Sequence, residues 1–285
     1  MGTTRMGSTT IGVLHPGAMG AAVARTLRNG GHDVVWASAG RGNATRDRAD
    51  RAGLRDVGSV HELCRVATIV MSVCPPHAAS DVARDVLAAG FHGTFVDANA
   101  ISPERSCAMG ELVEGAGASF VDGGIIGVPP ERPGATWLHL SGARAPEVAA
   151  AFIAGPLEVE VVSGRVGDAS AIKMCFAAYT KGSTALIATT FAAAHHHGVL
   201  EQLRTQWDRV DPDFFAAGAE RVRRATAKAW RFEGEMREID ATIAGAGAPA
   251  GFHAAAAVAY GRLERFKDDP QPPDLETILA ALLGS

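Results

Sequence analysis

The first part of the chain alternates short apolar runs with helix-type stretches, and this alternation stops at about Gly167. Most of the runs are continuously apolar, which is typical of parallel strands that are covered on both faces. Alternating β and α elements predict a doubly wound sheet. The predicted strands are residues 10–14, 33–37, 69–73, 94–97, 119–122, 137–141 and 159–163, with helices that include 20–29 and 76–89.

After Gly167 the chain becomes rich in alanine, with apolar residues at helical spacing. Residues 169–197 contain no proline and only one glycine, Gly182, so they predict a single helix about 45 Å long. Further helices are predicted at 213–231, 233–244, 253–266 and 274–283. The expected fold class is therefore an α/β domain, residues 1–166, followed by an all-helical domain, residues 167–285.

Charge and composition exclude several classes of function. A formal net charge of −4 argues against a nucleic-acid-binding surface. No apolar run has the length of a membrane span, and residues 1–9 lack a signal-peptide core. The four cysteines are scattered, so we expect no disulfide framework, no thiolate metal site and a cytoplasmic location. Histidines 195–197 point about 100° apart on a helix and cannot converge on one ion, so no metal is expected.

A glycine-rich loop follows the first predicted strand and opens the first predicted helix. It carries the second and third glycines of a G-x-G-x-x-G motif, Gly17 and Gly20, whereas His15 replaces the first glycine and Pro16 follows it. Such a loop lets backbone N–H groups approach a pyrophosphate. The alternative is an ordinary glycine-rich turn. The predicted cofactor contacts are His15, Pro16, Gly17, Ala18 and Met19, with Cys74, Pro75 and Asn99 from later loops.

The end of the second predicted strand bears on which dinucleotide binds. A carboxylate there would hold the ribose 2′-hydroxyl and repel a 2′-phosphate, but no acid follows this strand before Asp47. Ser38 can donate a hydrogen bond, and Arg41 can form a charge-assisted fork with a phosphate. NADP(H) is therefore favoured over NAD(H). The alternative is that Arg41, Arg46 and Arg48 are solvated loop charges.

Several runs together resemble the β-hydroxyacid dehydrogenase family, which includes hydroxyisobutyrate dehydrogenases and phosphogluconate dehydrogenases. The resemblance spans nearly the whole chain and rests on residues 11–20, 31–34, 97–103, 122–127 and 167–173. It implies a Rossmann domain, a helical dimerisation domain, a cleft between them and a small-molecule substrate. It also places the catalytic lysine of the family at Lys173, and the substrate-binding motif at Asp122–Gly127 with Gly123 and Gly124.

The chain departs from the family at three polar positions. The family's anion-contacting serine falls at Ile126, its asparagine at Ala177, and its Lys-Asp pair at Gly234-Glu235. We therefore expect a larger or more apolar pocket. On one helix, Thr180 and Lys181 share a face with Lys173, which suggests that one of them contacts substrate or cofactor. The alternative is that Lys181 faces solvent or a subunit contact.

The expected chemistry is hydride transfer to or from a nicotinamide, with Lys173 moving the proton. A lysine serves as general acid and base when burial lowers its pKa toward the working pH. Its alternative role is to cap the helix start or pair with Asp168. Gly123, Gly124 and Gly127 would offer backbone N–H groups to an anion, or form a plain turn.

Three functions remain open. The leading one is an NADP-dependent dehydrogenase or reductase acting on a β-hydroxy acid or related carbonyl compound. The second is an imine reductase, which the loss of the polar contacts favours and the presence of Lys173 disfavours. The third is a non-catalytic NADP-binding protein. For all three, the long alanine-rich helix suggests a homodimer that forms through the helical domain.

Overall fold

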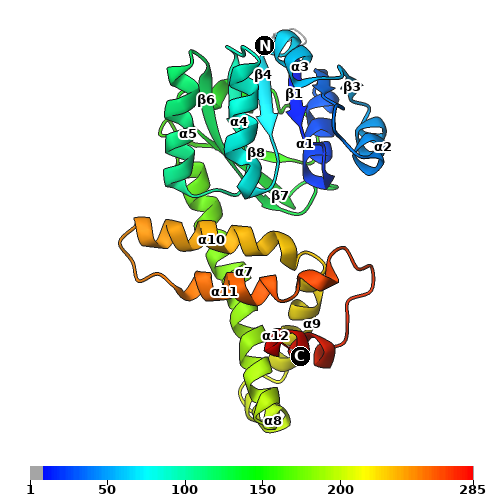
Figure 1. Cartoon of the computed structure of the whole chain (residues 1–285), viewed down its shortest axis with the longest axis vertical. Helices are drawn as coiled ribbons and strands as arrows, with labels where there is room; N and C mark the ends of the chain where they lie inside the picture. Colours follow the sequence, from blue (N-terminus) through cyan, green and yellow to red (C-terminus); the bar gives the residue numbers. More distant parts are fainter. Residues whose placement is uncertain (1–8, 285) are drawn as a thin grey trace, which may run out of the picture. The chain divides into compact units, whose positions relative to one another are not determined.

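The computed structural model describes residues 9–284 and divides the chain into two compact units (Figure 1). One unit ends at Lys173, and the other begins at Met174. The predicted domains, 1–166 and 167–285, stay a prediction, because compactness alone does not show which segments fold independently.

The first unit is built on an eight-stranded sheet with the order β3-β2-β1-β4-β5-β6-β7-β8. Strands β1 to β6 are parallel, as predicted, but β7 runs antiparallel to β6 and β8 is parallel to β7. The prediction of an α/β sheet is confirmed, but the last two strands run in the opposite direction and β3 was not predicted. The strands are β1 Thr10–Leu14, β2 Asp33–Trp36, β3 Arg55–Asp56, β4 Ile69–Ser72, β5 Thr94–Asp97, β6 Ser119–Gly127, β7 Thr136–Ser141 and β8 Glu158–Ser163.

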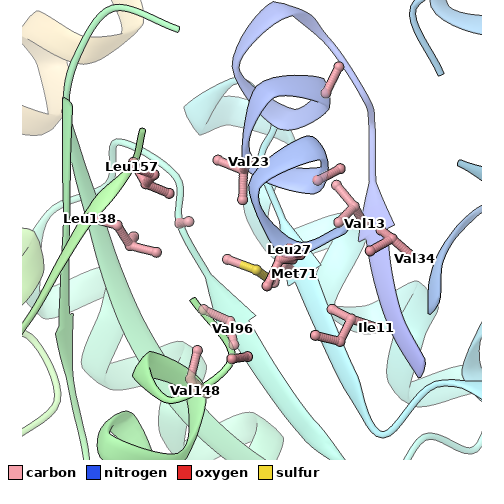
Figure 2. Close-up of a cluster of buried hydrophobic side chains, with 14 of the residues drawn as sticks. Ile11, Val13, Val23, Leu27, Val34, Met71, Val96, Leu138, Val148 and Leu157 are labelled. Carbon is pink, nitrogen blue, oxygen red and sulfur yellow. The ribbon is translucent and has the colours of Figure 1, made fainter. Parts of the chain in front are cut away.

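Helices cover both faces of this sheet. Alternate strand residues feed two buried clusters: Val34 and Trp36 pack on one face, and Val35 packs on the other. Figure 2 shows the first cluster, in which Val23 and Leu27 of α1 lie among side chains from the strands. This cluster takes residues from α1, α2 and α6, and the opposite one from α3, α4 and α5. The helices are α1 Ala18–Asn29, α2 Asn43–Ala52, α3 Val60–Val66, the 3₁₀ turn η1 Pro76–Ala78, α4 Ala79–Ala88, α5 Pro103–Gly115 and α6 Ala145–Ala149.

Strand β6 is longer than predicted. The prediction ended it at Asp122, but it continues to Gly127, and Gly123 and Gly124 pair with Leu140 and His139 of β7. The interpretation of these two glycines as a turn is therefore wrong. Pairing between β5 and β6 stops at Asp97 and Asp122, so the segment after Asp122 extends beyond the end of β5.

The rest of the chain is helical, as predicted. One predicted helix, 213–231, is wrong, because α9 ends at Thr226 and α10 begins at Ala229 without any glycine or proline at the break. The predicted helix 253–266 also ends early, at Gly261. The elements are α7 Asp168–His196, α8 Leu200–Asp208, α9 Phe214–Thr226, α10 Ala229–Gly245, α11 Phe252–Gly261, the 3₁₀ turn η2 Glu264–Phe266 and α12 Leu275–Leu283. Among residues 9–284, no helix has both the length and the apolar character that crossing a membrane requires.

Candidate cofactor site and catalytic lysine

The carboxyl ends of β1, β2, β4 and β5 lie at one edge of the sheet, because these strands are parallel neighbours. From β1 the chain continues through β2 and β3 on one side and returns through β4 and β5 on the other. A change of this kind creates a crevice at the carboxyl ends of the strands, where open α/β sheets bind their ligands. His15, Ser38, Cys74 and Asn99, all predicted from the sequence, follow these four strands.

The loop after β1 is shaped for an anion. The Gly17 N–H donates to the His15 carbonyl oxygen at 2.6 Å. A Cβ atom on Gly20 would lie 2.8 Å from that same oxygen, so the loop and the first turn of α1 require glycine at this position. Gly17 caps α1 with backbone only, since no side chain in the described part of the chain bonds to this end. The N–H groups of the first turn, together with the helix dipole, are suited to a pyrophosphate.

His15 replaces a glycine yet keeps the backbone conformation that favours glycine, with φ of 64°. Its Nδ1 atom is buried and has no hydrogen-bond partner among residues 9–284. Burial, and then the nearby positive charge of Arg41, lower the pKa of His15 from 6.5 to about 4. His15 is therefore neutral at physiological pH and offers this site a polar ring rather than a charge.

Asn99 ties together the ends of β4 and β5. Its side-chain amide donates to Asp97 Oδ1 at 2.5 Å and to Ser72 Oγ at 3.0 Å, and its Oδ1 accepts from the Cys74 N–H at 2.5 Å. Burial, and then the charge of Asp122, raise the pKa of Asp97 to about 7. Burial also raises the pKa of the Cys74 thiol to about 11, so this thiol stays protonated beside the crevice.

Ser38, in the loop after β2, lies beside a positive charge, Arg46, and a negative charge, Asp56. Ser38 is buried, and its carbonyl oxygen accepts from Arg46 Nη2 at 2.9 Å. Its hydroxyl and its N–H lower the pKa of Asp56, so Ser38 lies beside this carboxylate, which stands on β3. Sequence analysis missed Asp56, because only the pairing of β2 with β3 brings this acid to Ser38. Arg41 also faces this edge, since its charge acts on His15 and on Cys74.

Asp122 organises the start of α7. It is fully buried, and its two carboxylate oxygens accept hydrogen bonds from four residues of α5, β7 and the beginning of α7. The sequence offered no signal for this role beyond the position of Asp122 in the family motif. The donors are Ser106 Oγ at 2.8 Å, Ser141 Oγ at 2.9 Å, the Gly167 N–H at 3.1 Å, the Ser170 N–H at 2.9 Å and Ser170 Oγ at 2.5 Å.

Asp168, the first residue of α7, is held by the turn that precedes it. Its carboxylate accepts from Arg165 Nε at 2.9 Å and from Ser163 Oγ at 2.6 Å, and these bonds lower its pKa. A pairing between Asp168 and Lys173 would have to compete with both donors.

Lys173 lies against strand β6. A Cβ atom on Gly124 would meet the Ala169 carbonyl oxygen at 2.6 Å and Lys173 Cβ at 3.0 Å, so only glycine allows α7 to come this close. A Cβ on the neighbouring Gly123 would likewise meet the backbone of Ala98, one residue before Asn99. Through these contacts Lys173, which is half-buried, belongs to the same edge of the sheet as the cofactor loops.

The other predicted residues of this unit lie around that edge. Ala18 and Met19 are the first two residues of α1, and Pro75 is exposed just before η1. Pro16 accepts at its carbonyl oxygen from Arg48 Nε at 3.2 Å. Ile126 is buried in β6 and supplies an apolar side chain where the family has a serine.

The remaining predicted residues lie in the helical unit. Ala177 is buried, and the Thr180 hydroxyl donates to the Phe176 carbonyl oxygen at 3.1 Å. Lys181 forms an ion pair with Glu235, and its Nζ lies 4.7 Å from the centre of the Phe232 ring. A substrate contact by Lys181, which stays a prediction, would therefore share the ammonium group with the Glu235 carboxylate.

Comparisons with known proteins find a family match in each part of the chain. Residues 10–149 match the NAD binding domain of 6-phosphogluconate dehydrogenase, and residues 194–263 match a domain of unknown function (DUF1932). An uncharacterised 28.5 kDa protein of Methanothermus fervidus is 28% identical over 164 residues, which cover 58% of this chain and 62% of that protein.

Solved structures extend the likeness over the full fold. A conserved protein of unknown function, described as similar to 3-hydroxyacid dehydrogenases, is 28% identical with a TM-score of 0.64, covering 90% of this chain and 97% of its own. The 3-hydroxyisobutyrate dehydrogenase of Mycobacterium tuberculosis, with L-serine, shares the fold at 20% identity and a TM-score of 0.68, covering 96% of this chain and 99% of its own. Together these matches support a place for the chain, as a divergent member, among the β-hydroxyacid dehydrogenase-like NAD(P)-dependent oxidoreductases.

Proposed function

We propose that the chain transfers a hydride between NADP and a β-hydroxy acid or a related carbonyl compound, with Lys173 as general acid and base. One observation carries most weight: the contact of α7 with Gly124 holds Lys173 at the edge of the sheet where the dinucleotide loop lies. A dehydrogenase needs its proton-transfer group and its cofactor site at one edge of the sheet, because the hydride and the proton leave neighbouring atoms of the same substrate.

The cofactor would lie along the carboxyl ends of the strands. The N–H groups of the first turn of α1 suit its pyrophosphate, and Asn99 fixes the strand ends beneath it. Arg41 and Arg46 would attract a 2′-phosphate, which supports a preference for NADP(H) over NAD(H). The bound nicotinamide would supply or accept the hydride.

In oxidation, the neutral amine of Lys173 takes the hydroxyl proton as the carbonyl forms. In reduction, its ammonium group returns that proton to the carbonyl oxygen. Because the segment after Asp122 extends beyond β5, its free edge can offer backbone groups to the substrate near Gly123 and Gly124. We also keep Ala177, Thr180 and Lys181 as proposed substrate contacts.

An imine reductase is the second candidate. Ile126 supports it, because a buried isoleucine gives the pocket an apolar wall and no partner for a carboxylate. Lys173 opposes it, because imine reductases usually carry an acid or a tyrosine at this position. A non-catalytic NADP-binding protein would keep the cofactor loop and have no need of Lys173.

A homodimer is also proposed, through the helical unit. Phe176, Tyr179 and Leu186 share one face of α7 and are each about half or more exposed. Apolar residues in such a row commonly mark an interface with another protein. Light scattering would give the mass of a dimer, and Tyr179→Glu would give that of a monomer. The four free cysteines favour a cytoplasmic location.

The first test combines cofactor binding with a substrate panel. Nicotinamide fluorescence would measure the binding of NADPH and NADH, and the panel would compare β-hydroxy acids, aldehydes and cyclic imines. Lys173→Met should leave the dissociation constant for NADPH within about twofold and lower turnover by about 10²–10⁴-fold. Turnover of cyclic imines alone would favour the second candidate, and binding without any turnover would favour the third.

A further inference from the structure

An acid of β3 lies beside the end of β2, although no acid follows β2 along the chain before Asp47. Asp56 is the second residue of β3 and lies opposite Trp36, the last residue of β2. Its Oδ1 accepts from the Gly58 N–H at 2.8 Å, which closes the turn after β3. This hydrogen bond holds the Asp56 carboxylate at the turn, although the residue is exposed.

The two turns that surround Asp56 are joined by backbone bonds. The Val57 N–H donates to the Trp36 carbonyl oxygen at 3.0 Å, and the Ala39 N–H donates to the Gly58 carbonyl oxygen at 2.8 Å. Between these bonds, the hydroxyl and the N–H of Ser38 act on Asp56 and lower its pKa, so Ser38 lies beside this carboxylate. The carboxylate is thus held over the first residues after β2, where dinucleotide folds place the adenosine ribose.

The same place also carries a cation. Arg46 Nη2 donates to the Ser38 carbonyl oxygen at 2.9 Å, so its guanidinium also lies beside Ser38. Burial is the largest single influence on Asp56 and opposes its ionisation, but Ser38, Gly58 and the charge of Arg46 together outweigh it and lower the pKa. Asp56 is therefore negatively charged at neutral pH. Ribose hydroxyls can donate to a carboxylate, whereas a 2′-phosphate is repelled by it.

We propose that Asp56 determines cofactor choice, opposing the 2′-phosphate that Arg41 and Arg46 attract and leaving only a small preference for NADPH over NADH. The inference rests on the proposed function, because it assumes that a dinucleotide binds at this edge. It assigns specificity to a strand-paired acid that lies 18 residues after Ser38 in the chain.

The substitution Asp56→Asn isolates the charge. An asparagine side-chain oxygen can still accept from Gly58 and Ser38, so the turn should persist. A phosphate carries nearly two negative charges, so removing one neighbouring charge near the surface should tighten NADPH binding roughly tenfold. NADH binding should stay equal or weaken, because its ribose loses a charged acceptor.

The experiment titrates wild type, Asp56→Asn and a charge-matched control with four probes: NADPH, NADH, 2′,5′-ADP and 5′-AMP. The two nucleotides test the adenosine end without the nicotinamide. The control is Asp85→Asn, which removes an exposed acid from the second half of α4, a helix that runs from the carboxyl edge back toward the amino edge. Repeating the titrations from about 50 to 300 mM salt should reduce the gain for NADPH, because the effect is electrostatic.

The inference predicts that 2′,5′-ADP follows NADPH, that 5′-AMP follows NADH, and that Asp85→Asn changes neither. It is overturned if wild type binds the dinucleotides and Asp56→Asn changes NADPH and NADH affinity by the same factor, or changes neither. If wild type binds neither dinucleotide, the proposed function itself fails, and the inference fails with it.

Discussion

Two acids at the carboxyl edge of the sheet differ in burial and in the groups that surround them. Asp122 is fully buried, and its oxygens receive five hydrogen bonds from three elements. Asp56 is exposed on a two-residue edge strand, and its side chain accepts a hydrogen bond from the Gly58 N–H of the turn beside it. Asp122 joins the parts of the first unit to each other, whereas Asp56 presents a charge to whatever binds there.

The difference shows that one edge of the sheet can contain both an acid that folding constrains and an acid that can change at little cost in stability. A buried charge that loses its partners is costly, so the surroundings of Asp122 are constrained by folding. An exposed charge contributes little to stability but strongly influences a charged ligand nearby. Changes in stability should therefore concentrate around Asp122, and changes in cofactor choice around Asp56.

The largest expected difference compares Asp122→Asn with Asp56→Asn. An asparagine at 122 turns an NH₂ group toward backbone and hydroxyl donors, so we expect a loss of about 3 kcal/mol or more in unfolding free energy. This corresponds to a fall of about 10 °C in melting temperature. Asp56→Asn should stay within about 0.5 kcal/mol of wild type. Calorimetry and urea unfolding would measure both, and equal losses would contradict the comparison.

The next effect concerns the contact between β6 and α7. Gly124→Ala places a methyl group 2.6 Å from the Ala169 carbonyl oxygen and 3.0 Å from Lys173 Cβ, so the helix must move. Overpacking of this kind should cost about 2–3 kcal/mol and lower turnover with little change in NADPH binding. Gly115→Ala is the matched control, because a Cβ there meets nothing within 4 Å. Unchanged turnover in Gly124→Ala would separate Lys173 from the reaction.

The pH dependence of stability tests Asp97, the buried acid paired in register with Asp122. Its pKa is raised from 3.8 to about 7 in the folded chain, so the folded state holds more protons than the unfolded state between these values. The stabilising contribution is complete below about pH 4 and is lost as the pH rises through about 7. Between pH 5 and 7 this amounts to about 2 kcal/mol. Asp97→Asn should remove this slope from urea unfolding curves, and a slope that persists would assign it to other groups.

The smallest expected effect distinguishes the positioning of Lys173 from the stability of the fold. Ser170 and Ser106 each donate one hydroxyl bond to Asp122 Oδ1, but only Ser170 stands on the helix that carries Lys173. Ser170→Ala and Ser106→Ala should both cost about 1 kcal/mol of unfolding free energy. Only Ser170→Ala should also change the pH profile of turnover, with Ser170→Thr restoring it in part. Identical profiles for the two alanine variants would reduce Asp122 to a purely structural role.

Much of the fold could be predicted because its strands are buried on both faces. Strands β1 and β5 match the predicted ranges, and all but the first residue of β1 are buried. Strand β3 could not be found, because its two residues, Arg55 and Asp56, are both exposed and show no periodicity. The break between α9 and α10 was missed for a similar reason, since packing sets it at residues 227–228 without glycine or proline.

The parts of the candidate site that lie close together along the chain could be predicted from the sequence. The glycine loop and Lys173 lie in local patterns that the sequence displays directly. Asp56 was missed because it reaches Ser38 only through strand pairing, and the role of Asp122 depends on donors from distant elements. The reinterpretation of Gly123 and Gly124 as strand residues also depends on pairing, here with β7.

The contact at Gly124 has a consequence for how such a protein can change over evolution. Because α7 meets Gly124 with the Ala169 carbonyl oxygen and Lys173 Cβ, main-chain atoms and a Cβ, rather than longer side chains, set the position of Lys173 at this contact. Residues such as Ile126 can therefore vary without displacing Lys173. If the proposed function holds, a lineage could exchange one substrate for another by single substitutions while Lys173 stays in place.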